Sequence, residues 1–465
     1  RLKNGYLRCV VSSSSLEMGI DIGSVDLVIQ VGSPGSIATA LQRIGRAGHQ
    51  VGGLPRARFL PISPHDLLEL VALQTGILRG SMDILKFPEN CLDVLAQFLI
   101  GLSIIKEWDI DDAYELASAS WPYRNLPYDD YIEVLDLLED ERRIWVDWED
   151  NKFGKRGFAQ MIYYTNIGTI APNNNYLVFT SDGTMVGQLS SSFVSSLRNG
   201  DVFLLGGSTY RVSSIRGTRV NVSPATGYRP TIPSWTGEAN SRTHELSQEV
   251  LELLEEVATY TRLEKDPMTI FTNILGLNRP VAHAVSGFFQ EHVATTFQVP
   301  SNDLILVEQV EAPLPTYIVT TCRGRAFNLA LGHLFAGIAT NDNIIVHELS
   351  FDENGFMIKL SHEVEISLIP EIFKQGNSKD VLQKHMMESQ LFSKRFREIS
   401  SRSMLNPRRI GADEVSPKQF QQRAEQIMQK HRQMDDSVLI RETMNEILHS
   451  DLDMAQLEIF INRMD

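Results

Sequence analysis

Two short runs near the start of the chain have the residue types and spacing that phosphate chemistry needs. Residues 12–22 read Ser-Ser-Ser-Ser-Leu-Glu-Met-Gly-Ile-Asp-Ile, and residues 42–49, which begin 20 positions later, read Gln-Arg-Ile-Gly-Arg-Ala-Gly-His. A guanidinium group stays charged at neutral pH and donates two parallel hydrogen bonds to phosphate oxygens. Arg43 and Arg46 are therefore candidates for binding phosphate groups.

The flanking residues predict the elements that position these runs. Leu7–Val11 and Val25–Val31 read as short apolar strands, and residues 36–48 predict a helix that Ser36 can cap. Alternating strand and helix is typical of a parallel α/β layer, and this stretch is too short to be a whole domain of that class.

The two runs resemble motifs V and VI of superfamily 2 helicases, of the DEAD/DEAH type, in their order, spacing and predicted elements. His49 stands where helicases generally carry Arg, and with Gly32-Ser33-Pro34 it narrows the resemblance to the large helicase-related (Lhr) family. Further runs that resemble this family are Pro88–Gln97, Asn166–Ile170, Ile232–Glu238, Glu388–Phe392, Arg395–Arg397 and Pro407–Arg409. The resemblance covers nearly the whole chain and identifies it as the C-terminal part of the family's core.

The resemblance also implies roles for individual residues. Those it assigns are Arg46, Arg43 and Gln42 as catalytic residues on ATP; Gly19, Asp21 and Gly45 as ATP-binding residues; and Ser13, Ser14, Ile170, Trp235 and Arg229 as DNA-binding residues. The alternative for the first run and the two arginines is an ordinary serine loop and a solvated helix face.

Trp235 has a setting that suits base stacking. Pro230, Pro233 and Gly237 flank it and predict a stiff loop, and an indole on such a loop can stack on an unpaired base, worth about 1–3 kcal/mol. Without the resemblance, a tryptophan buried in the core is the other interpretation. The resemblance favours stacking, with Ile170 as a second apolar contact.

Charge is distributed unevenly along this chain of net charge −15. Residues 76–150 carry a net charge of −12, whereas residues 151–235 carry 8 basic and 2 acidic side chains. The basic residues of the latter segment, which fit sequence-independent phosphate binding, are Lys152, Lys155, Arg156, Arg198, Arg211, Arg216, Arg219 and Arg229. A second cluster, which either forms ion pairs or contacts DNA, comprises Lys394, Arg395, Arg397, Arg402, Arg408 and Arg409.

The pattern predicts a multidomain chain of α/β and α+β class. We expect the C-terminal part of a second RecA-like lobe at residues 1–78, a winged helix at 79–150, a basic β-rich, barrel-like DNA-binding region at 151–240, and an α/β part with C-terminal helices at 241–465. The β-prone runs of the third region are Gln160–Thr165, Tyr176–Thr180, Asp201–Leu205, Tyr210–Ile215 and Arg219–Val222. The predicted C-terminal helices are Ser378–Ser403, Pro417–Arg432, Ser437–Ser450 and Met454–Met464.

The chain holds no Gly-x-x-x-x-Gly-Lys-[Ser/Thr] loop and no Asp-Glu-x-His run. We therefore expect the ligands of ATP and Mg²⁺ to lie mostly on an N-terminal RecA-like lobe of the same parent chain, with this part inactive alone. A motor split between two polypeptides is the alternative. The 11 histidines and 3 cysteines show no metal-ligand spacing, so no metal site is expected. The few, scattered cysteines and the lack of an apolar run long enough to span a membrane indicate a cytoplasmic protein.

We expect the whole protein to be an ATP-dependent helicase that moves 3′-to-5′ on single-stranded DNA and unwinds duplex or RNA–DNA hybrid in DNA repair. Direction, substrates and pathway come from the resemblance alone. A non-enzymatic nucleic-acid-binding module that retains helicase remnants is the competing hypothesis. A helicase acting mainly on RNA is a further alternative, because stacking is indifferent to the sugar.

Overall fold

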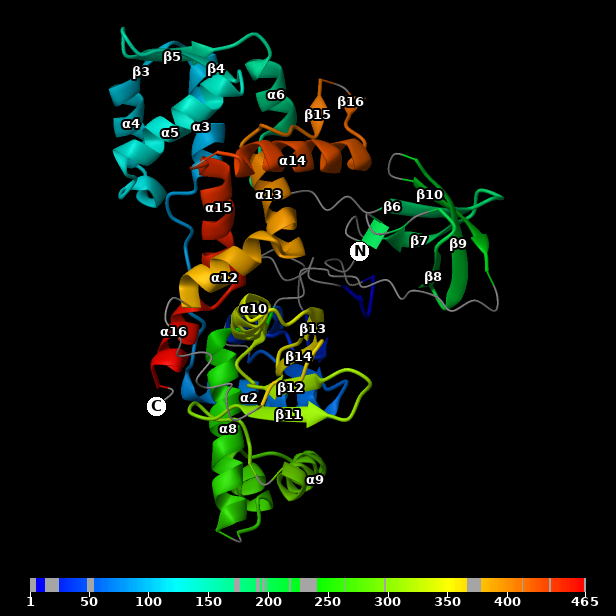
Figure 1. The fold of residues 1–465 in the computed structure, drawn as a ribbon. Helices are drawn as coiled ribbons and strands as arrows, with labels where there is room; N and C mark the ends of the chain where they lie inside the picture. Colours follow the sequence, from blue (N-terminus) through cyan, green and yellow to red (C-terminus); the bar gives the residue numbers. More distant parts are fainter. Residues whose placement is uncertain are drawn as a thin grey trace. The chain divides into compact units, whose positions relative to one another are not determined.

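The computed structural model describes residues 6–12, 25–47, 54–170, 176–189, 193–194, 197, 199–216, 219–225, 241–263, 265–296, 298–365, 378–411, 413–434 and 436–463. The chain forms two compact units, each built from segments far apart in sequence (Figure 1). Unit 1 comprises Arg1–Leu85, Asn240–His385 and Asp451–Asp465, and unit 2 comprises Lys86–Ala239 and Met386–Ser450. Both mix helices with sheets, which confirms the predicted class. No helix within the described ranges combines the length and the apolar composition that a membrane crossing requires.

The first segment of unit 1 alternates strand and helix, as predicted. Its elements are β1 (Val28–Val31), α1 (Ile37–Ile44), β2 (Ala57–Leu60) and α2 (Pro64–Arg79). β1 and β2 pair in parallel, with Val28 opposite Ala57. The predicted strand at Leu7–Val11 is wrong, since residues 6–12 have no regular structure. A strand needs a neighbour to take its backbone hydrogen bonds, and among the described residues the sheet of β1 and β2 holds no third strand.

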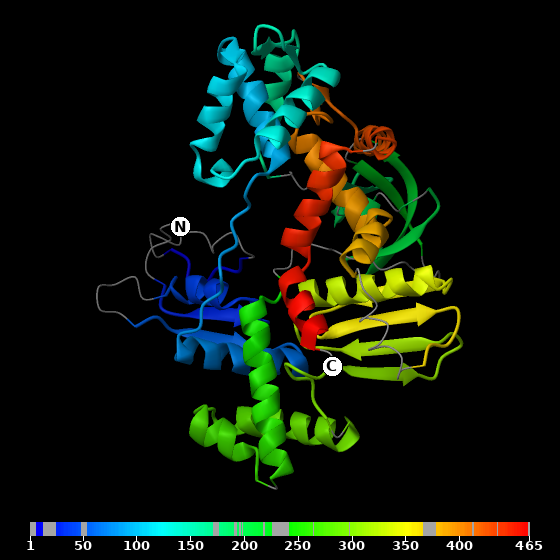
Figure 2. The same ribbon diagram turned by 60° about the vertical axis from the view of Figure 1, so that its left-hand side comes forward.

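The second segment of unit 1 begins with helices and continues as an antiparallel sheet. Its elements are α8 (His244–Arg262), a π-helical turn (Ile270–Ile274), α9 (Arg279–Thr296), β11 (Leu306–Val310), β12 (Thr316–Thr320), α10 (Arg325–Asn341), β13 (Val346–Phe351) and β14 (Gly355–Leu360). The strands lie in the order β11-β12-β14-β13. Figure 2 shows α10 across one face of this sheet, where it packs on β13 and β14, and α16 (Met454–Arg463) packs against α10.

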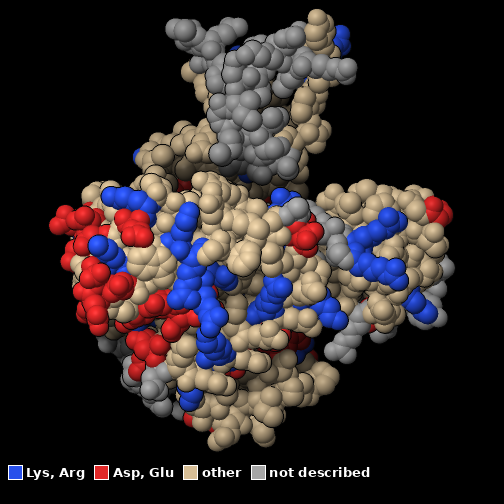
Figure 3. All heavy atoms as spheres, turned by 90° about the horizontal axis from the view of Figure 1, so that it is seen from above, with Lys and Arg blue, Asp and Glu red and all other residues tan. Residues whose placement is uncertain are grey.

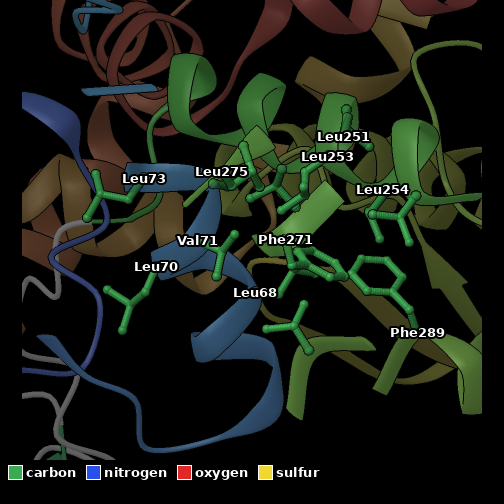
Figure 4. Packing of buried hydrophobic residues seen from close by; sticks show 14 of the residues in the cluster. Leu68, Leu70, Val71, Leu73, Leu251, Leu253, Leu254, Phe271, Leu275 and Phe289 are labelled. Atoms are coloured by element: carbon green, nitrogen blue, oxygen red, sulfur yellow. The ribbon is translucent and has the colours of Figure 1, made fainter. Parts of the chain in front are cut away.

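One apolar core joins the two segments of unit 1. Leu68 and Val71 of α2 contribute to it together with residues of α8 and α9 (Figure 4). The rings of Phe271 and Phe289 stack within it, with their centroids 6.0 Å apart. Because α2 packs on α8, the strand–helix segment is fixed to the rest of unit 1.

Unit 2 begins with a winged helix, as the sequence predicts. Its elements are α3 (Leu92–Ile105), β3 (Trp108–Asp109), α4 (Ile110–Ser118), α5 (Tyr128–Asp140), β4 (Ile144–Asp147) and β5 (Lys152–Lys155). The strands lie in the order β3-β5-β4, and β4 and β5 form the hairpin of the wing. The Asp109 carboxylate caps α4 by accepting from the backbone N–H groups of Asp111 and Asp112.

A five-stranded sheet with its own core follows. It comprises β6 (Tyr176–Thr180), β7 (Met185–Leu189), β8 (Val202–Leu205), β9 (Ser208–Arg216) and β10 (Arg219–Pro224), in the order β7-β6-β10-β9-β8. Four predicted β-prone runs lie in this sheet, as β6, β8, β9 and β10. The predicted strand at Gln160–Thr165 is wrong, because this stretch forms α6 (Ala159–Asn166). Its β-favouring residues are overridden by packing of α6 against α3.

The C-terminal helices of unit 2 return to the winged helix. α12 (Ser378–Met387) belongs to unit 1 as far as His385. The elements of unit 2 that follow it are α13 (Gln390–Arg402), β15 (Arg409–Ile410), β16 (Asp413–Glu414), α14 (Pro417–Arg432) and α15 (Val438–Glu446). The helix predicted over 378–403 is two helices, because Ser389 accepts from the Phe392 N–H at 3.1 Å and starts α13 anew. α13 and α15 both pack on α3.

Candidate functional site

α1 carries the arginines expected at the nucleotide. Ser36 caps this helix by accepting from the Thr39 N–H at 3.1 Å. Arg43 and Arg46 are both half-buried at its C-terminal end, while Gln42 and Gly45 are exposed. The last turn of α1 and the turn that follows it therefore carry one exposed glutamine and two half-buried arginines, of which Arg46 lies just beyond the C-cap Gly45.

Arg43 is held by a residue of the neighbouring strand. Its Nη1 donates to the Gln30 Oε1 on β1 at 2.9 Å, and the Gln30 Nε2 donates to the carbonyls of Val31 and Gly32 at 3.1 Å. The Arg46 Nε donates to the Gln42 carbonyl at 3.4 Å. Gln30 was not among the site residues predicted from the sequence. A glutamine in a strand carries no sequence signal that it orients an arginine 13 positions later.

The turn that leads into α1 is fixed by a carboxylate from α2. Gly32 and Gly35 both have positive φ, 74° and 73°, which only glycine adopts at little cost. Between them, the Ser33 N–H donates to the Asp66 Oδ1 at 2.6 Å, and the other Asp66 oxygen accepts from the Ile62 N–H at 2.8 Å. This tight backbone turn thus fixes the direction in which α1 leaves the end of β1.

The arginines at this end of α1 can bind an anion. Two guanidinium groups in a partly shielded place interact with phosphate more strongly than in bulk water. ATP fits these donors by its terminal phosphates. In the part of the chain that the structure describes, no group of three or more His, Cys, Asp or Glu side chains could hold a metal ion.

Several predicted site residues lie outside the described part of the chain. These are Ser13, Ser14, Gly19, Asp21, Arg229 and Trp235. Their assigned roles stay predictions. Of the predicted DNA contacts, only Ile170 belongs to the described residues.

Ile170 is one of four exposed apolar side chains on and around α6 in unit 2. Its side chain is 90% exposed, and Ile167, Tyr164 and Phe158 are 56%, 66% and 74% exposed. Lys152 and Lys155 of β5 are exposed nearby in the chain, just before α6. Exposed apolar groups beside cations suit a single nucleic-acid strand, whose bases stack and whose phosphates are anionic.

The loop before Ile170 is fixed by a glutamine buried in α3. The Gln97 Oε1 accepts from the Gly168 N–H at 3.1 Å, while its Nε2 donates to the Gly168 and Arg402 carbonyls at 3.3 and 2.9 Å. Asn166 similarly exchanges two 2.9 Å hydrogen bonds with the Arg409 backbone. The sequence showed Gln97 only as a polar interruption of an apolar helix. The structure gives it a function in holding the exposed loop.

A pocket of about 460 Å³ adjoins α6 within unit 2. Its lining residues are Arg143, Phe158, Met161, Ile162, Leu405, Asn406, Pro407, Ile410, Arg423, Gln426 and Ile427. The lining includes two arginines and no acidic side chain, so the pocket continues the basic and apolar character of the α6 surface.

Basic and acidic side chains are separated on the surface that Figure 3 shows. Lys and Arg gather in a band that borders a field of Asp and Glu, and a further group of Lys and Arg lies over the five-stranded sheet. On that sheet Arg216 and Arg219 are exposed, and the Arg219 guanidinium lies 3.8 Å from the centroid of the Phe179 ring. α4 and α5 carry acidic residues in their first turns. Some acids of residues 76–150 nevertheless pair with basic side chains, as Glu141 does with Lys430 and Asp130 with Arg441.

The second basic cluster forms ion pairs at two of its members. The Arg402 Nε lies 2.5 Å from the Asp93 carboxylate, and Arg402 also pairs with Glu446. Arg395 pairs with Glu446 at 3.5 Å and with Glu398 at 2.6 Å. Burial, followed by the nearby Asp93 charge, raises the pKa of the Glu442 carboxyl to about 8. For Arg395 and Arg402 the ion-pairing interpretation is confirmed; Arg395 links α13 to α15, and Arg402 links both to Asp93 of α3 in the winged helix.

Three family models match this chain. They are described as Helicase conserved C-terminal domain, over residues 1–50; Large helicase-related protein, winged helix domain, over residues 75–232; and DEAD/H associated, over residues 299–465. The first match contains α1 and its arginines, and the second contains the winged helix, α6 and the five-stranded sheet.

Curated relatives and a solved structure resemble nearly the whole chain. The ATP-dependent helicase Lhr-Core protein 2 of Thermococcus barophilus is 34% identical over 477 residues, which cover 99% of this chain and 55% of that protein. The ATP-dependent helicase Lhr-Core of Methanothermobacter thermautotrophicus is 35% identical over 474 residues, covering 98% and 54%. The structure of Mycobacterium smegmatis helicase Lhr bound to ssDNA and AMP-PNP matches with a TM-score of 0.77 and 26% identity, covering 100% of this chain and 56% of that one. The chain thus spans about half the length of these proteins.

Proposed function

Since the chain belongs to the large helicase-related (Lhr) family, as the C-terminal part of its core, we propose that the whole protein is an ATP-dependent DNA helicase and translocase. The observation that carries this proposal is the turn of α1 with Arg43 held by Gln30 and Arg46 beside it. Partly shielded guanidinium groups are the donors that a developing charge on a transferred phosphoryl group requires.

In this proposal Arg46 is the arginine finger on ATP. Arg43 and Gln42 lie beside it, and Gly19, Asp21 and Gly45 border the nucleotide. ATP supplies the free energy of the cycle through loss of its terminal phosphate. Mg²⁺ belongs to the proposal as a cofactor whose ligands lie mostly on an N-terminal RecA-like lobe of the same parent chain, because this chain holds no Gly-x-x-x-x-Gly-Lys-[Ser/Thr] loop and no Asp-Glu-x-His run. The residues of this chain bind and orient the phosphate.

Single-stranded DNA is the proposed track. Ser13 and Ser14 contact its phosphates, Trp235 stacks on a base, and Ile170 makes a second apolar contact, with Arg229 and the exposed lysines of β5 providing charge. The exposure of Ile170 and its fixed loop support this role. Movement is 3′-to-5′, with duplex DNA or RNA–DNA hybrid as substrates and DNA repair in the cytoplasm as the setting. The division of the chain at residues 78, 150 and 240 is part of the same proposal.

The test uses the full-length parent with DNA-stimulated ATP hydrolysis and strand displacement as readouts. We expect Arg46→Ala to lower hydrolysis by about 10³-fold or more, the range for removal of an arginine finger. Trp235→Ala is expected to keep hydrolysis and lose unwinding. Arg58→Ala is the matched control, because Arg58 is an exposed arginine on β2 of the same unit and is expected to change neither readout. If the wild-type protein shows no DNA-stimulated hydrolysis, the helicase proposal fails and a non-enzymatic binding module replaces it.

A further inference from the structure

The pocket beside α6 lies wholly within unit 2. Its wall is formed by the start of α6, by one face of α14, by Arg143 between α5 and β4, and by residues of the segment 405–410 after α13. Its volume of about 460 Å³ lies within the range of about 300–1,000 Å³ that is typical of small-molecule sites. The pocket is therefore large enough to take an organic group.

Arg143 contributes a positive charge to this wall that no acidic side chain neutralises. Its Nη2 donates to the Leu405 carbonyl at 3.0 Å, while its Nε is buried and has no acceptor among the described residues. Burial lowers the pKa of the Arg143 guanidinium. Glu141, whose charge opposes that shift, forms its ion pair with Lys430. A buried N–H of a charged group is stabilised by an acceptor, so the wall is suited to a ligand that brings one.

Asn406 contributes the opposite kind of group. Its side chain is 1% exposed, and its Nδ2 donates to the Phe420 carbonyl at 3.0 Å. Its Oδ1 is buried and receives no hydrogen bond from any residue that the structure describes. Gln426 of α14 adds a second amide to the lining. The edge of a nucleobase carries donors and acceptors side by side, and side-chain amides are common partners of such edges.

Most of the other lining side chains are apolar. Phe158, just before α6, lines the pocket and is nevertheless 74% exposed, so its ring is available for stacking on a flat ligand. Arg423 of α14 is exposed and forms no ion pair with the described residues. Apolar walls, an exposed ring, two amides and two arginines together match a nucleotide, which has a flat base with a polar edge and an anionic phosphate.

We infer that this pocket binds one nucleotide of a single-stranded DNA, with the base inside the pocket and the phosphate on Arg423. The base edge accepts from the Arg143 Nε and donates to the Asn406 Oδ1. The strand is available there because α6, about 12 Å long, leads from the pocket to the fixed loop before the exposed Ile170. This inference rests on the proposed function and adds a site in unit 2 where a base is held apart from its neighbours.

The experiment measures the Kd of the full-length parent for a labelled duplex with a 3′ oligodeoxythymidine tail, whose junction fixes the register. Abasic residues replace the thymidines of the tail one at a time. In the wild type we expect the position seated in the pocket to raise the Kd at least fivefold when abasic, the lower end of the range for one stacked base. Met161→Trp fills the pocket from α6 and is expected to raise the Kd for the intact tail at least fivefold and to abolish the abasic effect at that position.

Two pairs of variants separate the pocket from general surface effects. Gln160→Trp places the same indole at an exposed neighbouring position of α6 outside the lining, and is expected to keep the wild-type abasic profile. Arg423→Ala is expected to lower the slope of log Kd against log salt by about 0.7, the value for one phosphate contact on a single strand. Lys418→Ala removes an exposed cation of the same helix outside the lining and is expected to leave that slope unchanged.

The pocket is refuted if Met161→Trp keeps both the wild-type Kd and the wild-type abasic profile. It is also refuted if thymidine monophosphate alone binds the wild type but not Met161→Trp while both bind the tail equally, because the pocket would then hold a free nucleotide. If Met161→Trp does not fold, Phe158→Ala, which truncates an exposed ring, carries the same expectation. A wild type without DNA-stimulated hydrolysis would instead refute the proposed function, and the Kd measurements would still decide on the pocket.

Discussion

Ile170→Ala tests whether the exposed row on and after α6 is a DNA contact. Because Ile170 is 90% exposed, almost its whole side chain is available for burial by a bound strand. Full burial of an aliphatic side chain of this size is worth about 1.5–3 kcal/mol, and truncation to Ala removes about 1–2 kcal/mol of it. That difference corresponds to a roughly 5- to 30-fold increase in Kd for single-stranded DNA.

The same exposure predicts almost no effect on folding. A surface truncation away from any cap or network changes the free energy of unfolding by within about 0.5 kcal/mol. The assay is fluorescence anisotropy of a labelled oligodeoxythymidine with the full-length parent, with urea unfolding measured in parallel. Leu116→Ala is the control, because Leu116 is 45% exposed on α4 and follows the exposed Glu115, where phosphate is repelled.

Two outcomes would contradict the reasoning on Ile170. An unchanged Kd would remove it from the DNA path. A loss of unfolding free energy well above 0.5 kcal/mol with unchanged affinity would assign it to packing, which its exposure argues against.

Two further predictions concern the support of this surface. Gln97→Leu should destabilise unit 2 by about 1–3 kcal/mol, because it leaves the Gly168 N–H and the Arg402 carbonyl without this partner. Gln97→Leu should also weaken DNA binding, and in a double-mutant cycle its effect on the Kd should not add to that of Ile170→Ala, because both act through the same loop. Glu442 has a pKa raised to about 8 by burial, so its stabilising effect is fully present below about pH 4.5 and is lost as the pH rises through 8. Between pH 5.5 and 7.5 the free energy of unfolding of the wild type should therefore fall by up to about 1.4 kcal/mol per pH unit relative to that of Glu442→Gln. Urea unfolding midpoints that change equally with pH in the two proteins would contradict this.

The local elements of the site were predictable from sequence. The predicted cap Ser36 starts α1, and the predicted β-prone runs Tyr176–Thr180 and Arg219–Val222 form β6 and most of β10. Capping and periodicity are encoded within one or two turns, so a single sequence contains them. The assignment of Arg46 and Trp235 to ATP and DNA came from the family resemblance and stays a prediction.

The partners of these elements were not predictable. The Asp83 carboxylate accepts from the Ala38 N–H, 45 positions away, and from the Thr243 hydroxyl, 160 positions away, and no periodicity reports a contact at that separation. The strand predicted at Gln160–Thr165 failed for the same reason, since contact of α6 with α3 outweighs the β preference of its residues. Side chains such as Gln30 and Gln97 are informative only once the strand or loop that they hold is known.

The order in which unit 2 is assembled from the chain has a consequence for biosynthesis. Asp93 is made with the first turn of α3, but its partner Arg402 follows 309 residues later. At about 5–20 residues per second, the ribosome needs roughly 15 to 60 s to supply it. During that interval the α3 surface that later packs on α13 and α15 faces water in the nascent chain. A chain stalled before residue 386 should therefore depend on chaperones, and both units reach completion only after residue 385 has been translated.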